Sequence, residues 1–281
     1  LKSAHAVDRE CRVMTALHDT DVPVPKTFGY CDDETIIGTP FFVMDHVIGN
    51  IYWELLLPGC DPNQRREIYL SMNDTIAKLH NVDFDKVNLA DYGKHENYMD
   101  RQIHRWTKQY KDSETQMIPE INELIEWLPK NIPSDQETSI VHGDFRLDNM
   151  IFDPITHEVK AILDWELSTL GNPIADFTYH MMSWRLPAGA KGLGMMGSDL
   201  KSLNIPSESE YAELYYKKTG REKIDNWDFY MAYNIFRLAG IAQGIVGRVR
   251  DGTASSSEAK NYEAFVPILG KLGWSIVEGI K

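Results

Sequence analysis

The chain has 281 residues, of which 43% are apolar and 25% charged, enough to bury a sizeable core in one large domain or two lobes. Lysine and arginine number 29 against 42 aspartate and glutamate residues, so the net charge is −13. This acidic balance argues against general nucleic-acid binding and against docking on anionic membranes. The three cysteines form no ligand-spaced pair, no apolar run is long enough to span a membrane, and no signal-peptide pattern opens the sequence. We therefore expect a globular cytoplasmic protein with neither a nucleic-acid nor a membrane partner.

The first part of the sequence predicts one helix and two strands. Apolar residues recur at spacings of three and four over residues 4–18, which is typical of an amphipathic helix. Residues 26–30 and 40–47 have the composition of strands, and the second is a continuous apolar run that predicts a strand covered on both faces. Gly49 and Asn50 then interrupt the pattern. We place a boundary there, with a small strand-bearing part over 1–48 and a larger part over 49–281.

The larger part is mostly helical, with a short β insert. Helical spacing predicts helices over residues 62–80, 97–111 and 114–128. Residues 139–142 and 159–163 have the pattern of strands and flank a third short piece at 149–152. Helices resume at Pro173, with a long one over 226–248, a serine-rich loop at 253–257 and a last helix through Trp274. The fold class is thus α+β, and its layout predicts a ligand cleft between a small front and a large back.

Three oxygen-bearing side chains surround the β insert. Asp144 follows a predicted strand, Asn149 comes five residues later, and Asp164 ends the strand that returns from the hairpin. Because the ends of these strands converge, we expect the three side chains to face one small volume. Carboxylate and amide oxygens suit Mg²⁺, which takes one or two carboxylates together with water and phosphate oxygens. The pattern therefore predicts phosphoryl transfer, with one carboxylate free to accept a proton.

The segments HGDFRLDN, ILDWE and NPIADF closely resemble the aminoglycoside phosphotransferase-like family of small-molecule kinases. Within that family, the chain is most similar to the kinase-like domains associated with acyl-CoA dehydrogenases. The resemblance extends from HAVDRECRVMTAL through GTPFFVMDHVIG to FYMAYNIFRLAGIAQG, which is nearly the whole chain. It implies a two-lobed protein-kinase-like fold. Residues 1–48 would form a truncated, strand-bearing N-lobe that binds nucleotide, and residues 49–281 a large, mostly helical C-lobe for catalysis and substrate binding. It also implies ATP and Mg²⁺ as cofactors.

The resemblance implies a role for each matching residue. Asp144 would be the catalytic base, and Asn149 and Asp164 would hold the magnesium ions. His142 and Asp176 would support the catalytic loop. The cofactor-binding residues would be the helix carboxylate that pairs with an ATP-binding lysine and the hinge that faces adenine, namely Glu10, Met44, Asp45, His46 and Val47. Two alternatives stay open, because Asp176 could cap the helix after Pro173 and Glu10 could be an ordinary surface residue.

The sequence also departs from kinase patterns before Glu10. A working site needs a phosphate-covering loop and a strand lysine ahead of that helix, and Lys2 lies too close to Glu10 to be that lysine. We expect a segment upstream of Leu1 to supply both elements. A non-catalytic pseudokinase that binds nucleotide is the alternative. A hydrolase that uses the same carboxylates would need a water-positioning group, which the sequence does not reveal.

The acceptor is expected to be a hydroxyl group of a small molecule. Only eight residues separate Asp164 from Pro173, too few for the platform on which protein kinases bind peptides, and Gly143 stands where those enzymes carry an arginine. The closest resemblance favours a hydroxyacyl-CoA or hydroxy acid and a functional association with an acyl-CoA dehydrogenase. The acidic charge would instead suit an aminoglycoside- or choline-type acceptor. Candidate substrate residues are Trp165, Glu166, Tyr233, Arg237 and Gln243.

Overall fold

The computed structural model describes residues 7–134, 137–189, 192–223, 226–253 and 262–280. The chain divides into two compact units, each built from two separate segments. The first unit comprises residues 1–94 and 138–223, and the second comprises 95–137 and 224–281. The boundary that we expect between residues 48 and 49 is not one of the limits of these units, and it remains a prediction. The fold class is α+β, as the sequence indicates.

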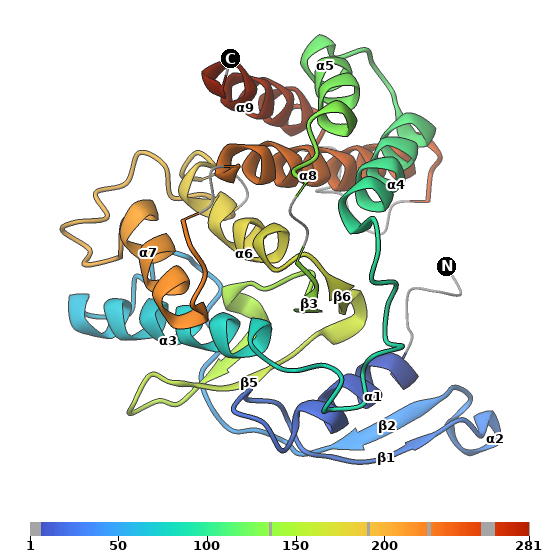
Figure 1. Cartoon of the computed structure of the whole chain (residues 1–281), viewed down its shortest axis with the longest axis vertical. Coiled ribbons are helices and arrows are strands. Elements are labelled where there is room, and N and C mark those ends of the chain that lie inside the picture. The colour runs from blue at the N-terminus through green and yellow to red at the C-terminus, as the bar shows by residue number, and fades with distance from the viewer. Residues whose placement is uncertain (1–6, 135–136, 190–191, 224–225, 254–261, 281) are drawn as a thin grey trace. The chain divides into compact units, whose positions relative to one another are not determined.

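The first unit begins with a helix packed on a two-stranded hairpin (Figure 1). Helix α1 (Val7–Leu17) buries one apolar face, and the antiparallel strands β1 (Thr27–Cys31) and β2 (Phe41–Met44) are joined by the short helix α2 (Glu34–Ile37). The prediction that the second strand is covered on both faces is wrong, because Val43 is 50% exposed. Among the described residues this sheet has two strands, so its apolar run extends beyond what α1 covers.

The rest of the first unit carries two further strand pairs. Strand β3 (Ser139–Val141) pairs with β6 (Thr169–Gly171), and β4 (Met150–Phe152) pairs with β5 (Val159–Ile162). The sequence predicts β3, β4 and β5, but not β6, whose three residues give no usable alternation. The short turns η2 (Leu147–Asn149) and η3 (Trp165–Leu167) follow β3 and β5.

Helices α3 and α7 lie side by side in this unit (Figure 1). Helix α3 (Pro62–His80) begins in a capping box between Asp61 and Gln64. Helix α7 (Glu208–Thr219) begins after the Ser207 cap and ends at Gly220. Between them in sequence come α6 (Pro173–Met181) and η4 (Met182–Trp184), and every residue of α6 is buried.

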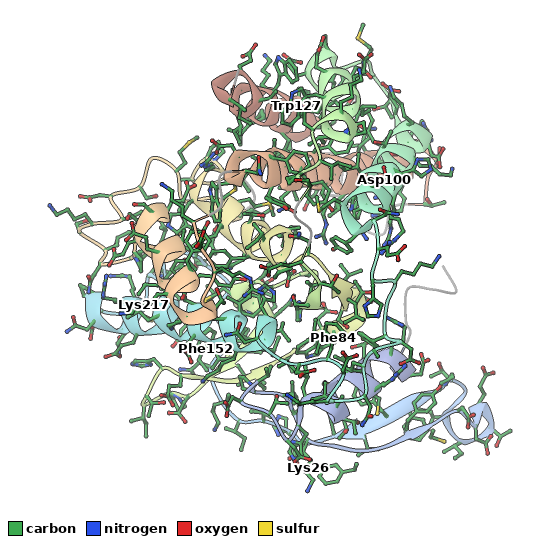
Figure 2. The ribbon with its side chains drawn as sticks, viewed as in Figure 1. Lys26, Phe84, Asp100, Trp127, Phe152 and Lys217 are labelled. Carbon is green, nitrogen blue, oxygen red and sulfur yellow. The ribbon has the colours of Figure 1, made fainter. Side chains whose placement is uncertain are left out.

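The second unit is helical. Helices α4 (Tyr98–Ser113), α5 (Pro119–Trp127), α8 (Trp227–Arg250) and α9 (Phe265–Ile280) pack together, with η1 (Leu128–Lys130) after α5. The helix expected over 114–128 starts later, because Glu114 terminates α4 and Pro119 occupies the first turn of α5. Trp127, labelled in Figure 2, packs its ring on Phe229 at 5.9 Å. Among the helices of the described ranges, none is both long and apolar enough to cross a bilayer.

A buried histidine lies in the aromatic core of the first unit. The ring of His180, on α6, contacts Phe145, Trp184 and Tyr211, and its Nε2 is 2.9 Å from the Tyr211 hydroxyl. Burial disfavours the charged imidazolium and lowers the pKa of His180 to about 4. His180 is therefore neutral at pH 7 and stays neutral as the solution becomes mildly acidic.

We predict that His180 makes the protein less stable in mild acid. Between pH 6.5 and about 4 the unfolded chain binds a proton at this histidine that the folded chain does not, so stability falls as pH falls. In urea unfolding, wild type should lose about 2 kcal/mol more than His180→Gln between pH 7 and pH 5. Equal losses in the two proteins would show that the folded protein protonates His180 as readily as the unfolded chain does.

Candidate active site

The loop after β3 is anchored by one buried carboxylate. Asp176, on α6, accepts hydrogen bonds from the backbone N–H groups of His142 (2.9 Å) and Gly143 (2.8 Å). His80, at the end of α3, approaches the same carboxylate with its Nε2 at 3.2 Å, and its Nδ1 is 2.7 Å from the Tyr215 hydroxyl. Burial would raise the pKa of Asp176, but the hydrogen bond and charge of His80 outweigh it and lower that pKa. Asp176 is therefore held as a carboxylate.

Asp176 does not cap its own helix. The cap of α6 is Asn172, whose side-chain oxygen accepts from the backbone N–H groups of Ile174 (3.0 Å) and Ala175 (2.9 Å). The capping alternative for Asp176 is thus wrong. With the helix N-terminus satisfied by Asn172, the Asp176 carboxylate is available to the loop.

His142 connects the two segments that carry the acids. Its ring is fully buried, its Nδ1 accepts from the backbone N–H of Asp144 (3.2 Å), and its Nε2 lies 2.9 Å from the Leu163 carbonyl. These partners require the tautomer with hydrogen on Nε2. The backbone N–H of Leu163 also donates to the backbone carbonyl of Asn149 at 2.8 Å. The loop bearing Asp144 and Asn149 is therefore tied directly to the residue before Asp164.

Both oxygens of the Asp144 carboxylate have donors. The Tyr179 hydroxyl donates to Oδ1 at 2.8 Å, and the Asn149 amide nitrogen donates to Oδ2 at 3.2 Å and to the Asp144 carbonyl at 2.9 Å. Nearby, Arg146 forms a two-pronged ion pair with Asp148. Burial lowers the pKa of Arg146, but the charges of Asp144 and Asp148 outweigh it and raise that pKa. Asp144 is half-buried, fixed in orientation and next to a permanent cation.

The side-chain oxygens of Asn149 and Asp164, which could bind a metal ion, form no hydrogen bond or ion pair with any described residue. The Asn149 amide uses its nitrogen toward Asp144, which leaves its Oδ1 uncommitted. Asp164 is exposed, has a left-handed backbone (φ 63°), and makes no side-chain hydrogen bond or ion pair with any described residue. No group of three His, Cys, Asp or Glu residues in the described ranges could hold a metal. One carboxylate and one amide oxygen nevertheless fit Mg²⁺, which completes its shell with water and phosphate oxygens.

The expected hinge residues line a cavity of about 540 Å³ in the first unit. Its lining is largely apolar and consists of Pro25, Met44, Asp45, His46, Val47, Ile48, Gly49, Ile51, Ile151 and Leu163. The backbone N–H of Asp45 donates to the Lys26 carbonyl at 2.8 Å, whereas those of His46 and Val47 bond to no described residue. The cavity thus has largely apolar walls, two of its lining residues have backbone N–H groups without a described partner, and Leu163 places one wall beside Asp164.

Other predicted site residues of the first unit have different surroundings. Glu10 is half-buried on α1, and Lys2 lies outside the described residues. Trp165 is fully buried: its indole nitrogen donates to the Ile162 carbonyl at 3.0 Å and its ring packs on His142 at 4.8 Å. Trp165 therefore supports the catalytic loop through its contact with His142. Glu166 is exposed.

The remaining substrate candidates belong to the second unit. Tyr233, Arg237 and Gln243 are buried in α8. The Arg237 guanidinium lies over the Trp106 ring at 5.4 Å from its centroid, and the Gln243 amide nitrogen donates to the Ser113 carbonyl at 2.6 Å. These contacts hold α8 to α4, and a role in substrate binding remains a prediction.

Sequence reasoning did not identify Tyr179, His80 or Arg146 at this site. Tyr179 comes three residues after Asp176 on a predicted helix, so the two share a helix face, and this spacing could have indicated it. Arg146 follows Asp144 by two residues within the quoted motif. His80 has no local signal, because it meets Asp176 only through the packing of α3 against this loop.

Gly143 is required by both its backbone angle and its neighbours. Its φ is +84°, and a Cβ there would lie 2.7 Å from the Leu167 carbonyl oxygen. We predict that Gly143→Ala costs about 2 to 4 kcal/mol in the free energy of unfolding. The matched control is Gly38→Ala, with φ +88° but nothing within 4 Å of the added carbon. It should cost only about 1 kcal/mol. Equal losses in urea unfolding would contradict the clash with Leu167.

Comparison with known proteins places this site in a family. The model of the phosphotransferase enzyme family matches residues 2–213. Acyl-CoA dehydrogenase family member 10 of Mus musculus is 45% identical over 98% of this chain, which covers 26% of that protein. The chain thus spans between about a quarter and a third of the curated relatives that it matches.

Solved structures agree with the family match. A provisionally assigned aminoglycoside phosphotransferase from Ralstonia eutropha is 49% identical, with a TM-score of 0.94 over 98% of this chain and 84% of that one. The aminoglycoside phosphotransferase APH(3'')-Id of Streptomyces rimosus, in complex with ADP and streptomycin, is 16% identical, with a TM-score of 0.57 over 84% of each chain, and shares the fold. The resemblance noted in the sequence is confirmed, and the chain belongs to the phosphotransferase enzyme family.

Proposed function

We propose that this chain is the phosphotransferase domain of an ATP- and Mg²⁺-dependent small-molecule kinase. The observation that carries the proposal is the division of labour among three oxygen-bearing side chains. Asp144 is held by donors on both carboxylate oxygens, whereas the Asn149 amide oxygen and the Asp164 carboxylate bond to no residue that the structure describes. A fixed carboxylate suits a catalytic base, and free oxygens beside it suit metal ligands.

Asp144 is the residue of the chain that acts directly on the acceptor hydroxyl in this proposal. The carboxylate of Asp144 accepts a hydrogen bond from the acceptor hydroxyl, orients its oxygen toward the terminal phosphorus and takes its proton. The new bond joins that oxygen to phosphorus as the bond to the leaving ADP oxygen breaks. Positioning supplies most of the rate enhancement, so the bonds from Asp176 and His142 that fix the loop are part of the machinery.

Asn149 Oδ1 and the Asp164 carboxylate are the groups that would hold Mg²⁺. Bound there, the ion would neutralise charge on the phosphate oxygens. The guanidinium of Arg146 is paired with Asp148 and lies near Asp144.

The nucleotide would lie in the cavity lined by residues 44–49. Its apolar walls suit a purine ring, and the backbone N–H groups of His46 and Val47, which have no partner among the described residues, can donate to ring nitrogens. The ADP complex of the Streptomyces relative, which shares the fold, supports the use of a nucleotide. We assign ATP as the donor.

The acceptor we propose is the hydroxyl of a hydroxyacyl-CoA or hydroxy acid. The support is the 45% identity, across nearly the whole chain, to a protein named for the acyl-CoA dehydrogenase family. The same relationship supports a functional association with an acyl-CoA dehydrogenase, whose substrates are also acyl chains.

A screen of acceptors with the full-length protein tests this function. ATP, Mg²⁺ and single candidates are incubated with the protein, and phosphorylated products are detected by mass spectrometry. The panel contains hydroxyacyl-CoAs, hydroxy acids, choline and an aminoglycoside. Phosphorylated hydroxyacyl products support the proposal, and turnover of choline or the aminoglycoside alone would replace the acceptor class. Nucleotide binding without any product would favour the non-catalytic module.

Replacing the proposed base should abolish turnover and spare nucleotide binding. Asp144→Asn keeps the shape of the side chain but cannot take the hydroxyl proton, so kcat should fall by about 10² to 10⁴. The Kd for ATP, measured by calorimetry, should change less than about threefold. The control is Asp153→Asn, which removes the charge of a carboxylate that accepts from the Ile155 and Thr156 backbone in the turn between β4 and β5. Near-normal turnover by Asp144→Asn would refute the assignment of the base.

Replacing Asp164 should change the magnesium requirement. Asp164→Asn removes the charge of the exposed carboxylate, so the half-saturating Mg²⁺ concentration for turnover should rise at least about tenfold. Asp153→Asn should leave it unchanged. An unaltered magnesium requirement in Asp164→Asn would remove Asp164 from the proposed ligands.

A further inference from the structure

Helix α6 contacts the catalytic loop at two points that are one turn apart. Asp176 holds the backbone of His142 and Gly143, and Tyr179, three residues later, donates to the side chain of Asp144. Residues at this spacing lie on the same face of a helix. One face of α6 therefore forms hydrogen bonds both to the backbone of the catalytic loop and to the carboxylate of Asp144.

The hydrogen bond from Tyr179 is made by a rigid and buried donor. Tyr179 is 4% exposed, and α6 is buried along its whole length. A phenol has two side-chain torsions, so packing of its ring fixes the position of its hydroxyl. The 2.8 Å bond to Oδ1 is charge-assisted and is thus stronger than a bond between neutral groups.

This bond determines which lone pairs of Asp144 remain for the acceptor. A carboxylate has about four acceptor sites. Tyr179 takes one on Oδ1 and the Asn149 amide takes one on Oδ2. Without Tyr179, the Asn149 amide would be the one described side-chain donor left to the carboxylate, over the longer 3.2 Å contact, and the carboxylate could rotate away from the acceptor.

We infer that Tyr179 is a positioning residue that orients the Asp144 carboxylate for the acceptor hydroxyl. This inference rests on the proposed function and adds to it a residue that is not part of the lining of the proposed nucleotide cavity. The Asn149 amide is also held by the Asp144 carbonyl at 2.9 Å, so its free oxygen keeps its orientation when Tyr179 is changed. Loss of Tyr179 should therefore affect the proton-accepting step and leave the magnesium requirement unchanged.

The test compares Tyr179→Phe with Tyr211→Phe. The second variant removes another buried tyrosine hydroxyl, bonded to His180 at 2.9 Å rather than to the catalytic loop. With ATP and the acceptor found in the screen, or with water as acceptor, Tyr179→Phe should lower kcat by about tenfold to hundredfold. The KM for ATP and the half-saturating Mg²⁺ concentration should stay within about twofold. Tyr211→Phe should keep kcat within about twofold, even where it lowers the melting temperature.

A double-mutant cycle separates orientation of the base from a merely structural role. In an Asp144→Ala background there is no carboxylate to orient, so Tyr179→Phe should not change the residual rate further. An equal fold-loss in both backgrounds, or an unchanged kcat in Tyr179→Phe alone, overturns the inference. If wild type and Asp144→Ala turn over ATP equally, the proposed function fails and this inference with it. If Asp144→Ala loses turnover and Tyr179→Phe does not, the role of Tyr179 is refuted and the proposed function stands.

Discussion

The buried carboxylate of Asp176 is the constraint on which the rest of the site depends. A charged group inside a protein is stable only when hydrogen bonds and an opposite dipole or charge replace its water. Asp176 obtains these from two consecutive backbone N–H groups of the catalytic loop and from His80. The same bonds that stabilise the acid therefore fix the loop. Asp176 and the loop after β3 cannot move independently without leaving a buried charge unsatisfied.

The fixed loop distinguishes otherwise similar oxygen donors. Asp144 and Asp164 are chemically identical side chains, yet one is half-buried between two donors and the other is exposed without a described partner. Asn149 links the segments that carry them, since its side-chain nitrogen donates to Asp144 and its backbone carbonyl accepts from the N–H of Leu163, the residue before Asp164. His142 connects the same two segments through its ring, which bonds to the backbone of Asp144 and of Leu163. A single small network thus separates a positioned base from groups that are free to bind a cation.

The family relationship and the site geometry bear on different questions. The match to the phosphotransferase enzyme family covers residues 2–213, which include the whole catalytic loop and α6. It leaves out most of the second unit, where Tyr233, Arg237 and Gln243 are buried on α8. The class of reaction therefore rests on the first unit. The choice of acceptor rests on the similarity of the whole chain to proteins of the acyl-CoA dehydrogenase family.

Residue types and their spacing are enough to predict the helices α1, α3, α4 and α8, the strands β3, β4 and β5, and the candidates Asp144, Asn149, Asp164 and Asp176. The partners of these residues follow from tertiary packing: His80 meets Asp176 across 96 residues, Tyr179 meets Asp144 across 35, and β6 pairs with β3. Periodicity reports on neighbours within a turn or a strand. Bonds between distant segments, and therefore which carboxylate is held and which is free, depend on how the helices and strands pack.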